Sequence, residues 1–326
     1  MSPAWIGCGT AALTALLVGL IRQYALRTRL LDLPGPRASH RVPTPRGGGL
    51  APASLLAATL AWAAFEAPQE REPLGPAALG LALVAAVGWR DDRRALSVGA
   101  RLGAHLVAGA LLLPLALQIP ESTWASGALG ALWWLVWAVS AVNVVNFMDG
   151  IDGLVGSQMA VFGIHLALLG RDPTAHAFGA VLAGAALGFL CWNWAPARIF
   201  LGDVGSGSLG LAAAIGGMLA IRSSEGGVMR AFLPLYPMFL DATITLLRRL
   251  GRGEPIHLPH RTHLYQRLAN DRGWGHARVS LLYAAAALAG VAAVHVPSPP
   301  LHGVAIGAYA IGVLALGWAL DRGGGA

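Results

Sequence analysis

The sequence contains no lysine and few charged residues of any kind. Only 12% of its 326 residues are charged, whereas about 25% is usual in soluble domains. Without lysine the chain cannot carry a Walker A loop, which needs a Gly-Lys pair. Because 56% of the residues are apolar, the composition also excludes a disordered chain. It favours a membrane protein.

Cysteine is scarce as well. Cys8 and Cys191 are the two cysteines of the chain, too few for a disulfide scaffold. Both lie in apolar stretches that we expect near opposite membrane faces, so the distance between them excludes a bridge. The histidines lack the usual spacing of zinc ligands. We therefore expect free thiols and no zinc site.

Apolar stretches recur along the whole chain. Each approaches the roughly 20 residues that a helix needs to cross a bilayer. The sequence therefore predicts one all-α polytopic membrane domain over residues 1–326, with about eleven transmembrane helices. The predicted spans are Pro3–Leu20, Gly48–Phe65, Leu74–Trp89, Ala100–Leu117, Ser126–Val145, Ile151–Leu169, Ala175–Trp192, Ser206–Ile221, Met229–Leu247, Val279–Val296 and Leu301–Leu320.

The arginines predict the orientation of these spans. Of the 23 arginines, 19 fall in or beside the odd-numbered connections or at the C-terminus. Positive side chains concentrate in cytoplasmic loops, so we expect the N-terminus outside and the C-terminus in the cytoplasm. No arginine stripe with interleaved aromatics accompanies the net charge of +7, and nucleic acid is therefore not an expected partner.

Six aspartates fall at or near the predicted cytoplasmic ends of different spans. So many carboxylates at a low-dielectric boundary are costly unless cations neutralise them. A divalent ion bound to a phosphate-bearing substrate would do so, and Mg²⁺, with Mn²⁺ as an alternative, suits an oxygen-rich site. The six are Asp91, Asp92, Asp149, Asp152, Asp203 and Asp241.

Two glycine-rich segments carry three of these acids. In GDVGSG, Asp203 stands just before a predicted helix, where glycines and free N–H groups favour a bound anion. In NFMDGIDG, Asn146, Asp149 and Asp152 are three residues apart and can face one ligand. Alternatively, the two aspartates of the second segment cap the next helix.

The remaining motifs combine charge and histidine. Asp91 and Asp92 precede Arg93 and Arg94; they either end a span or engage a phosphate, which arginine forks match. In the last cytoplasmic loop His260, Arg261 and His263 stand close together, and His40 lies in the first. The histidines are either solvated or part of a basic wall for an anionic leaving group or a sugar.

Taken together and in this order, the motifs resemble the polyprenyl-phosphate N-acetylhexosamine-1-phosphate transferases of glycosyltransferase family 4. The resemblance runs from about Asp32 to about Arg278 through SHRVPTPRGGG, the DD pair, NFMDGIDGL, PARIFLGDVGSGSLG and HRTHLYQRL. It implies a bacterial inner-membrane enzyme with its active site on the cytoplasmic face. The expected substrates are a UDP-N-acetylhexosamine and undecaprenyl phosphate, with Mg²⁺ as cofactor and UMP as product.

The resemblance also implies residue roles. Asp203 matches a metal ligand, and Asp91 and Asp92 match the acidic pair that engages the polyprenyl phosphate. Phe200 matches an aromatic that stacks on uracil. The other expected site residues are Asn146, Asp149 and Asp152 for the nucleotide diphosphate, His260, Arg261 and His263 for the sugar, and Arg46 and Arg94, with Arg37 and Arg198, for the phosphates.

The last loop departs from part of the family. Tyr265 and Gln266 stand where members that use other sugars carry histidines. The loop looks more like the branch that initiates O-antigen with FucNAc or QuiNAc, and a UDP-GlcNAc-specific initiator of another glycopolymer is the alternative. A lipid-linked sugar flippase and an inactive scaffold remain less favoured, because the outer loops hold few reactive groups. A homodimer is compatible with the sequence.

Overall fold

The computed structural model describes residues 2–35, 39–40, 42–120, 127–223, 227–255, 260–296 and 299–322. This part of the chain is mainly helical, with one short antiparallel pair of strands in which Leu31 pairs with Pro45 and Asp32 with Thr44. The strands are β1 (Leu31–Asp32) and β2 (Thr44–Pro45); the helices are α1 (Pro3–Thr28), α2 (Leu50–Glu66), η1 (Pro68–Glu70), α3 (Arg71–Arg93), α4 (Val98–Ala110), α5 (Leu113–Ala116), α6 (Gly127–Phe147), α7 (Leu154–Leu169), α8 (Pro173–Asn193), α9 (Asp203–Ser223), α10 (Gly227–Phe232), η2 (Leu233–Leu235), α11 (Tyr236–Gly251), α12 (Leu264–Gln266), η3 (Arg267–Asp271), α13 (His276–Val294) and α14 (Pro299–Arg322).

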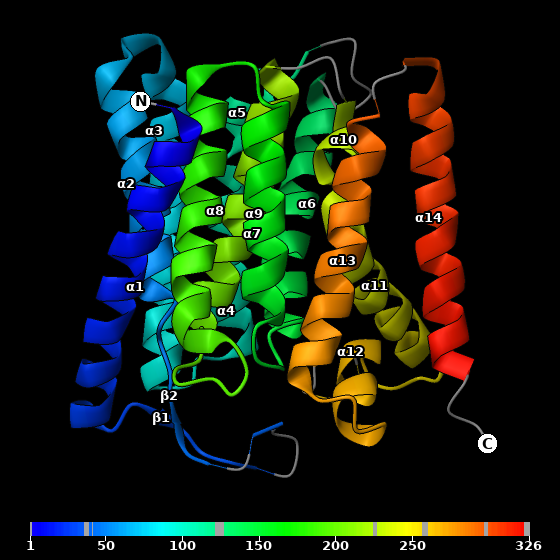
Figure 1. Ribbon diagram of the computed structural model, residues 1–326. Coiled ribbons are helices and arrows are strands. Elements are labelled where there is room, and N and C mark those ends of the chain that lie inside the picture. The colour runs from blue at the N-terminus through cyan, green and yellow to red at the C-terminus, as the bar shows by residue number, and fades with distance from the viewer. Residues whose placement is uncertain are drawn as a thin grey trace.

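The long helices lie side by side in one bundle, and the two chain ends lie at opposite ends of it (Figure 1). Among the described residues, seven helices are long and apolar enough to cross a membrane, and two apolar helices, Leu50–Glu66 and Leu154–Leu169, are shorter. The prediction of an all-α membrane protein is therefore confirmed. The number of eleven spans and the orientation of the termini stay predictions.

Proline interrupts the two other predicted spans. Ala100–Leu117 divides into α4 and α5, with Pro114 in the first turn of α5. Met229–Leu247 divides into α10, η2 and α11, whose second and third pieces carry Pro234 and Pro237 in their first turns. Proline lacks the N–H that a continuous helix requires, so both stretches are helical without being single helices.

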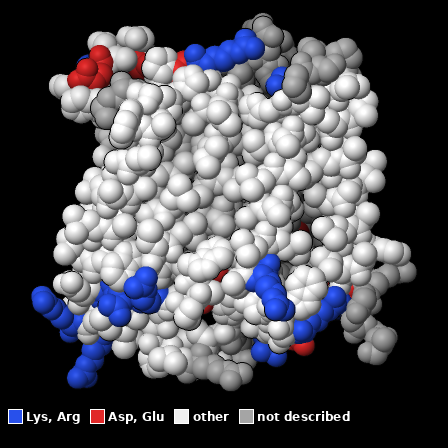
Figure 2. Space-filling model, viewed as in Figure 1, with Lys and Arg blue, Asp and Glu red and all other residues white. Residues whose placement is uncertain are grey.

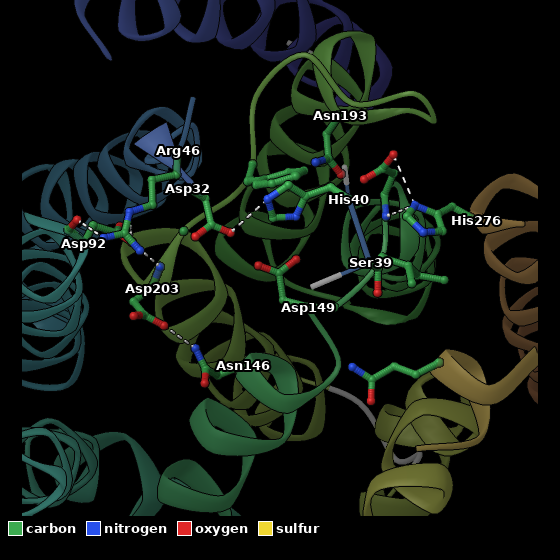
Figure 3. A pocket seen from close by; sticks show the side chains of 16 residues that line it. Asp32, Ser39, His40, Arg46, Asp92, Asn146, Asp149, Asn193, Asp203 and His276 are labelled. Atoms are coloured by element: carbon green, nitrogen blue, oxygen red, sulfur yellow. Dashed lines mark hydrogen bonds and ion pairs between the residues drawn. The ribbon is translucent and has the colours of Figure 1, made fainter. Parts of the chain in front are cut away.

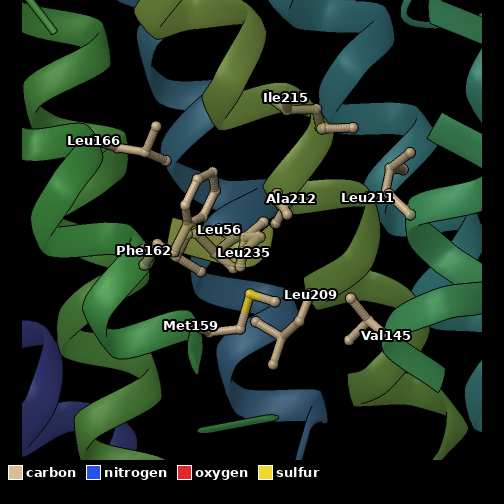
Figure 4. Close-up of a cluster of buried hydrophobic side chains, with 14 of the residues drawn as sticks. Leu56, Val145, Met159, Phe162, Leu166, Leu209, Leu211, Ala212, Ile215 and Leu235 are labelled. Carbon is tan, nitrogen blue, oxygen red and sulfur yellow. The ribbon is translucent and has the colours of Figure 1, made fainter. Parts of the chain in front are cut away.

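Helix α9 lies at the centre of the bundle and packs against α2, α3, α6, α7 and α8. All of its 18-residue apolar window is buried. Leu209, Leu211, Ala212 and Ile215 of α9 join side chains from the neighbouring helices in the core shown in Figure 4. This burial fixes the position of the N-terminal end of α9, which carries Asp203.

Glycine allows α9 to approach its neighbours closely. A Cβ on Gly88 of α3 would lie 2.5 Å from the backbone oxygen of Asp203, and one on Gly49 would lie 2.1 Å from the Cα of Gly205. Neither position has room for a side chain. The start of α9 is thus held against the ends of α2 and α3 by backbone contact.

Charged side chains gather at the two ends of the bundle and leave an uncharged band between them on the face in Figure 2. The lower end in this view carries most of the visible arginines. Such a band is what a bilayer core requires, because charges within it are costly. Both cysteines are free, as the sequence predicts.

Candidate active site

A polar cavity of about 290 Å³ opens at the end of the bundle where β1, β2 and the α3, α6 and α8 C-termini meet. Five parts of the chain that are far apart in the sequence supply its walls (Figure 3). Seven residues expected from the sequence line it: Arg46, Asp92, Asn146, Asp149, Asp152, Phe200 and Asp203. We call this cavity the polar pocket.

Asp92 is nearly fully buried and holds the start of α9. Its two carboxylate oxygens accept hydrogen bonds from the backbone N–H groups of Asp203 (3.0 Å) and Val204 (3.1 Å). Arg46 lies 3.9 Å from the same carboxylate and donates to the Asp92 backbone oxygen. A carboxylate at a helix N-terminus satisfies N–H groups that the helix leaves unpaired. Asp92 therefore positions Asp203.

Asp203 stands in the first turn of α9 and faces the end of α6. Its Oδ1 accepts a hydrogen bond of 2.6 Å from the Asn146 amide, which also donates to the Ser206 hydroxyl at 2.9 Å. The amide fixes the direction of the carboxylate. The Asp91 carboxyl group is a further neighbour of the Asp203 carboxylate.

Asp149 lies in the turn between α6 and α7. Burial, and then the nearby carboxylates of Asp203 and Asp92, raise the pKa of Asp149 well above its ordinary value. Burial and neighbouring negative charges both disfavour the ionised form of a carboxyl group. A cation between these acids would favour their ionised forms.

Asp152 occupies another wall of the pocket, beside the N-terminal end of α13. Its carboxylate accepts a hydrogen bond from the Ala197 backbone N–H (3.0 Å) and lies 3.2 Å from Nδ1 of His276. The Asn193 side chain accepts from the Gly153 backbone N–H at 2.9 Å and donates to the Ile199 backbone oxygen at 3.1 Å. These bonds tie the turn after α6 to the loop after α8.

Phe200 and His40 form an aromatic corner of the same pocket. Their ring centroids are 4.9 Å apart in an edge-to-face arrangement, and Nε2 of His40 lies 3.8 Å from the Asp32 carboxylate. Figure 3 shows His40 and Asp32 on the pocket wall. A planar base could stack in this corner, since aromatic faces and edges attract each other.

A second cavity, of about 270 Å³, adjoins the first. Asp203 and Asn146 line both cavities. The second is mostly apolar, with walls from α3, α4, α6 and α11 that include Val87, Leu102, Val142, Phe147 and Leu246. We call it the apolar groove.

Asp91 faces the apolar groove, whereas its neighbour Asp92 faces the polar pocket. Its carboxylate lies 3.2 Å from Nη1 of Arg101 and also accepts from the Leu96 backbone N–H. Successive helical residues point in different directions, which explains the division. The acidic pair predicted to act together thus belongs to two adjoining cavities.

The donor set of the polar pocket fits Mg²⁺. In the described part of the chain no three His, Cys, Asp or Glu side chains lie close enough to form a metal cluster by themselves. Mg²⁺, however, usually takes only one or two carboxylates and fills its other positions with water and substrate phosphates. Asp203 and Asp149, which both line the polar pocket, could hold such an ion.

The structure does not bring the histidine loop into the polar pocket. His263 is buried and its Nδ1 lies 3.7 Å from the Asp241 carboxylate, which also accepts from the Leu264 and Tyr265 backbone N–H groups. Asp241 is thus an anchor for this loop, because a buried carboxylate requires several donors. His260 stacks beside His263, and burial lowers the pKa of His260 to about 4.

Of the expected arginines that the structure describes, one lies in the polar pocket and the others lie outside it. Arg46 lines the polar pocket, whereas Arg94 and Arg261 are exposed and line neither cavity. Arg198 stacks over Trp192 and donates to the Cys191 backbone oxygen. Arg37 lies outside the described residues. For Arg94, Arg198 and Arg261, phosphate or sugar contact requires a movement that this structure does not show.

Four polar residues that the sequence did not single out also line the polar pocket: Asp32, Ser39, Asn193 and His276. Gln266 is the one member of the HRTHLYQRL segment that reaches the pocket. The polar residues Asn193 and His276 stand directly at helix ends, and this position next to the predicted cytoplasmic face is the signal that could have identified them.

Comparison with known proteins shows the family to which the chain belongs. The model of the family described as "Glycosyl transferase family 4" matches residues 75–223. The decaprenyl-phosphate N-acetylglucosaminephosphotransferase of Mycobacterium leprae is 30% identical over 86% of this chain and 79% of its own length. The chain belongs to glycosyl transferase family 4.

Two further relatives differ in their names. A probable undecaprenyl-phosphate N-acetylglucosaminyl 1-phosphate transferase of Bacillus subtilis is 26% identical over 78% of this chain and 74% of its own length. A phospho-N-acetylmuramoyl-pentapeptide-transferase of Synechococcus is 30% identical over 83% of this chain and 84% of its own length. The family contains enzymes that differ in the sugar they transfer, so membership alone leaves the sugar open.

Proposed function

We propose that the protein transfers an N-acetylhexosamine 1-phosphate from a UDP-sugar to undecaprenyl phosphate at the cytoplasmic face of a bacterial inner membrane. The observation that carries this proposal is the shared wall: Asp203 and Asn146 line both the polar pocket and the apolar groove. A water-soluble nucleotide sugar and a membrane-bound lipid phosphate could meet there. The named relatives act on decaprenyl or undecaprenyl phosphate.

The polar pocket suits the nucleotide sugar. Phe200 and His40 offer a stacking corner for uracil, and Asp152 and Asn193, each fixed by backbone hydrogen bonds, offer polar atoms for the ribose and base. Arg46 stands beside Asp92 near the start of α9. A guanidinium and a helix N-terminus are both favourable neighbours of a diphosphate.

The apolar groove suits the lipid phosphate. Its walls are apolar over most of their extent, and Arg101 lies at the polar end beside Asp91. An arginine held by one carboxylate can still donate other N–H groups to a phosphate. Asp91 and Arg101 would orient the lipid phosphate toward Asp203.

The reaction exchanges one phosphoanhydride for another. An oxygen of the lipid phosphate attacks the sugar-bearing phosphorus, a new P–O bond forms, and the P–O bond to UMP breaks, so UMP leaves with the electron pair. Mg²⁺ bound with the diphosphate would neutralise charge on the phosphorus. Asp203 and Asp149 would hold the ion, and Asn146 would keep Asp203 in direction.

The sugar is a finer part of the proposal. Gln266 reaches the polar pocket, and the family resemblance places it where members that use other sugars are expected to carry histidine. We infer a 6-deoxy-N-acetylhexosamine such as FucNAc or QuiNAc, transferred as the first sugar of an O-antigen type polysaccharide. UDP-GlcNAc is the second candidate, because the Mycobacterium and Bacillus relatives are named for N-acetylglucosamine.

A donor panel tests the proposal. The purified protein is incubated with Mg²⁺, undecaprenyl phosphate and each of UDP-GlcNAc, UDP-FucNAc and UDP-QuiNAc, and released UMP is measured. We expect UMP only when both lipid and Mg²⁺ are present, with one 6-deoxy donor fastest. Absence of UMP with every donor would contradict the transferase; translocation of a lipid-linked sugar without UMP release would support a flippase instead.

A further inference from the structure

A third cavity lies away from the reaction site, between α11, α13 and α14. At about 520 Å³ it is larger than either of the other two. Leu240 and Ile244 of α11, Leu282 of α13, and Ile311 and Leu314 of α14 supply apolar walls. We call it the α14 groove.

The groove ends at a cluster of charged side chains. Arg248 lies 2.6 Å from the Asp321 carboxylate through Nη1, and Arg267 donates to the other oxygen of the same group. Arg272 donates to the Asp321 backbone oxygen at 3.3 Å. Two arginines thus contact the Asp321 carboxylate and a third contacts its backbone, so this cluster has an excess of positive charge.

The two arginines that line the groove are accessible. The side chains of Arg248 and Arg267 are 45% and 35% exposed. A guanidinium has five N–H donors, so the one contact of Arg248 and the two hydrogen bonds of Arg267 to Asp321 leave donors for a further anion. Figure 1 places the C-terminal ends of α11 and α14 at the same end of the bundle as β1 and β2. Most of the arginines visible in Figure 2 lie at this end.

Helix α14, which forms one wall of the groove, packs loosely against the rest of the bundle. Only 6% of the apolar window of α14 is buried, and Figure 1 shows this helix at the edge of the bundle. In a bilayer, apolar surface alone does not drive one helix against another, because lipid tails are equally apolar. An acyl chain can therefore occupy the space that side chains leave between α14 and its neighbours.

We propose that the α14 groove binds an anionic membrane phospholipid, with an acyl chain between α14 and α11 and the phosphate on Arg248 and Arg267. Basic sites between transmembrane helices are suited to anionic headgroups. Helix α11 separates this groove from the apolar groove: Leu246 faces one and Ile244 and Arg248 face the other. The α14 groove is therefore distinct from the apolar groove, and the inference does not depend on the transferase reaction.

Lipid binding to the whole purified protein tests this inference. The delipidated protein is titrated with phosphatidylglycerol or with phosphatidylcholine of the same chains, and bound lipid is counted by native mass spectrometry. We expect phosphatidylglycerol to bind roughly tenfold or more tightly, given about 1 kcal/mol for each nearby arginine. Arg248→Gln combined with Arg267→Gln should remove this preference, whereas Arg252→Gln, outside the groove, should keep it.

A second pair of variants leaves the arginines intact. Gly317 lines the groove and Gly312 does not, and an added Cβ at either position has no neighbour within 4 Å. Gly317→Leu should fill the groove and weaken phosphatidylglycerol binding severalfold, while Gly312→Leu should not. Equal binding of both lipids, equal effects of both glycine variants, or displacement of the bound lipid by equimolar undecaprenyl phosphate would overturn the proposal.

Discussion

Helices α9 and α14 are both apolar and long enough to span a membrane, yet they lie in opposite surroundings. The apolar window of α9 is completely buried, whereas that of α14 is 6% buried. An added Cβ on Gly205 or Gly210 of α9 would come within about 2.6 Å of neighbouring atoms, while Gly312 and Gly317 of α14 have none within 4 Å.

This difference separates two tasks. Phosphoryl transfer needs groups held in fixed positions, and the close packing around α9 holds Asp203 against α3 and α6. A helix that faces lipid needs only apolar side chains, and it tolerates substitutions that change the residues packed beside it. Substitutions in the closely packed region around α9 should therefore have much larger effects than substitutions where packing is loose.

The largest effect is expected at the start of α9. Asp203→Ala should lower UMP release by roughly a thousandfold, as for loss of a central electrostatic group, without loss of folded protein. Asp172→Ala is a matched control, because Asp172 also lies at a helix start and accepts from the Ala175 N–H at 2.7 Å, but at the other end of the bundle. It should cost about 1 kcal/mol of stability and leave the rate near wild type. Retained metal-dependent activity in Asp203→Ala would refute its ligand role.

The next effect concerns the packing of α3 against α9, and two glycines of α3 test it. Gly88→Ala should destabilise the protein by about 1–3 kcal/mol through overpacking, because the new Cβ would meet the Asp203 backbone at 2.5 Å. Gly75→Ala in the same helix meets nothing within 4 Å and should be neutral. Thermal loss of monodisperse protein in size-exclusion chromatography measures both. Equal stability of the two variants would show that α9 can move away from α3.

A smaller change is expected in donor choice. Gln266→His should shift the ratio of kcat/KM for UDP-GlcNAc over a 6-deoxy donor by about tenfold, within the range that one pocket contact supplies. Gln118→His, where Gln118 accepts from Arg222 far from the pocket, is the control. An unchanged ratio in Gln266→His would remove this residue from sugar selection.

The smallest effect is expected at Asp149, where a substitution should raise the stability of the protein and not lower it. The raised pKa of Asp149 means that the folded protein binds a proton that the unfolded chain releases near the ordinary value of 3.8. Stability of the metal-free protein should therefore be higher at low pH and fall as pH rises above this value. Asp149→Asn should lessen this decline, to which the nearby carboxyl groups of Asp92 and Asp203 also contribute, and should raise Tm by a few degrees in chelator at neutral pH. A Tm equal to or below wild type would contradict the assigned shift.

The sequence predicts more of the fold than of the site. Long apolar stretches become helices because length and composition act locally, but Pro114, Pro234 and Pro237 divide two of them. Most of the residues expected at the site do meet in one pocket. His263 does not, because Asp241, within an apolar helix, is a closer partner, and no local pattern announces that pairing.

By itself, the sequence determined that the chain is a helical membrane protein and that acidic turns recur at the ends of its helices, since both depend on composition and spacing along the chain. Only the tertiary structure decided that Asp91 and Asp92 serve different cavities, that Asp92 holds the start of α9, and that His276 faces Asp152. These outcomes depend on the direction of each side chain at the end of its helix, and that direction is set by the packing of helices distant in sequence.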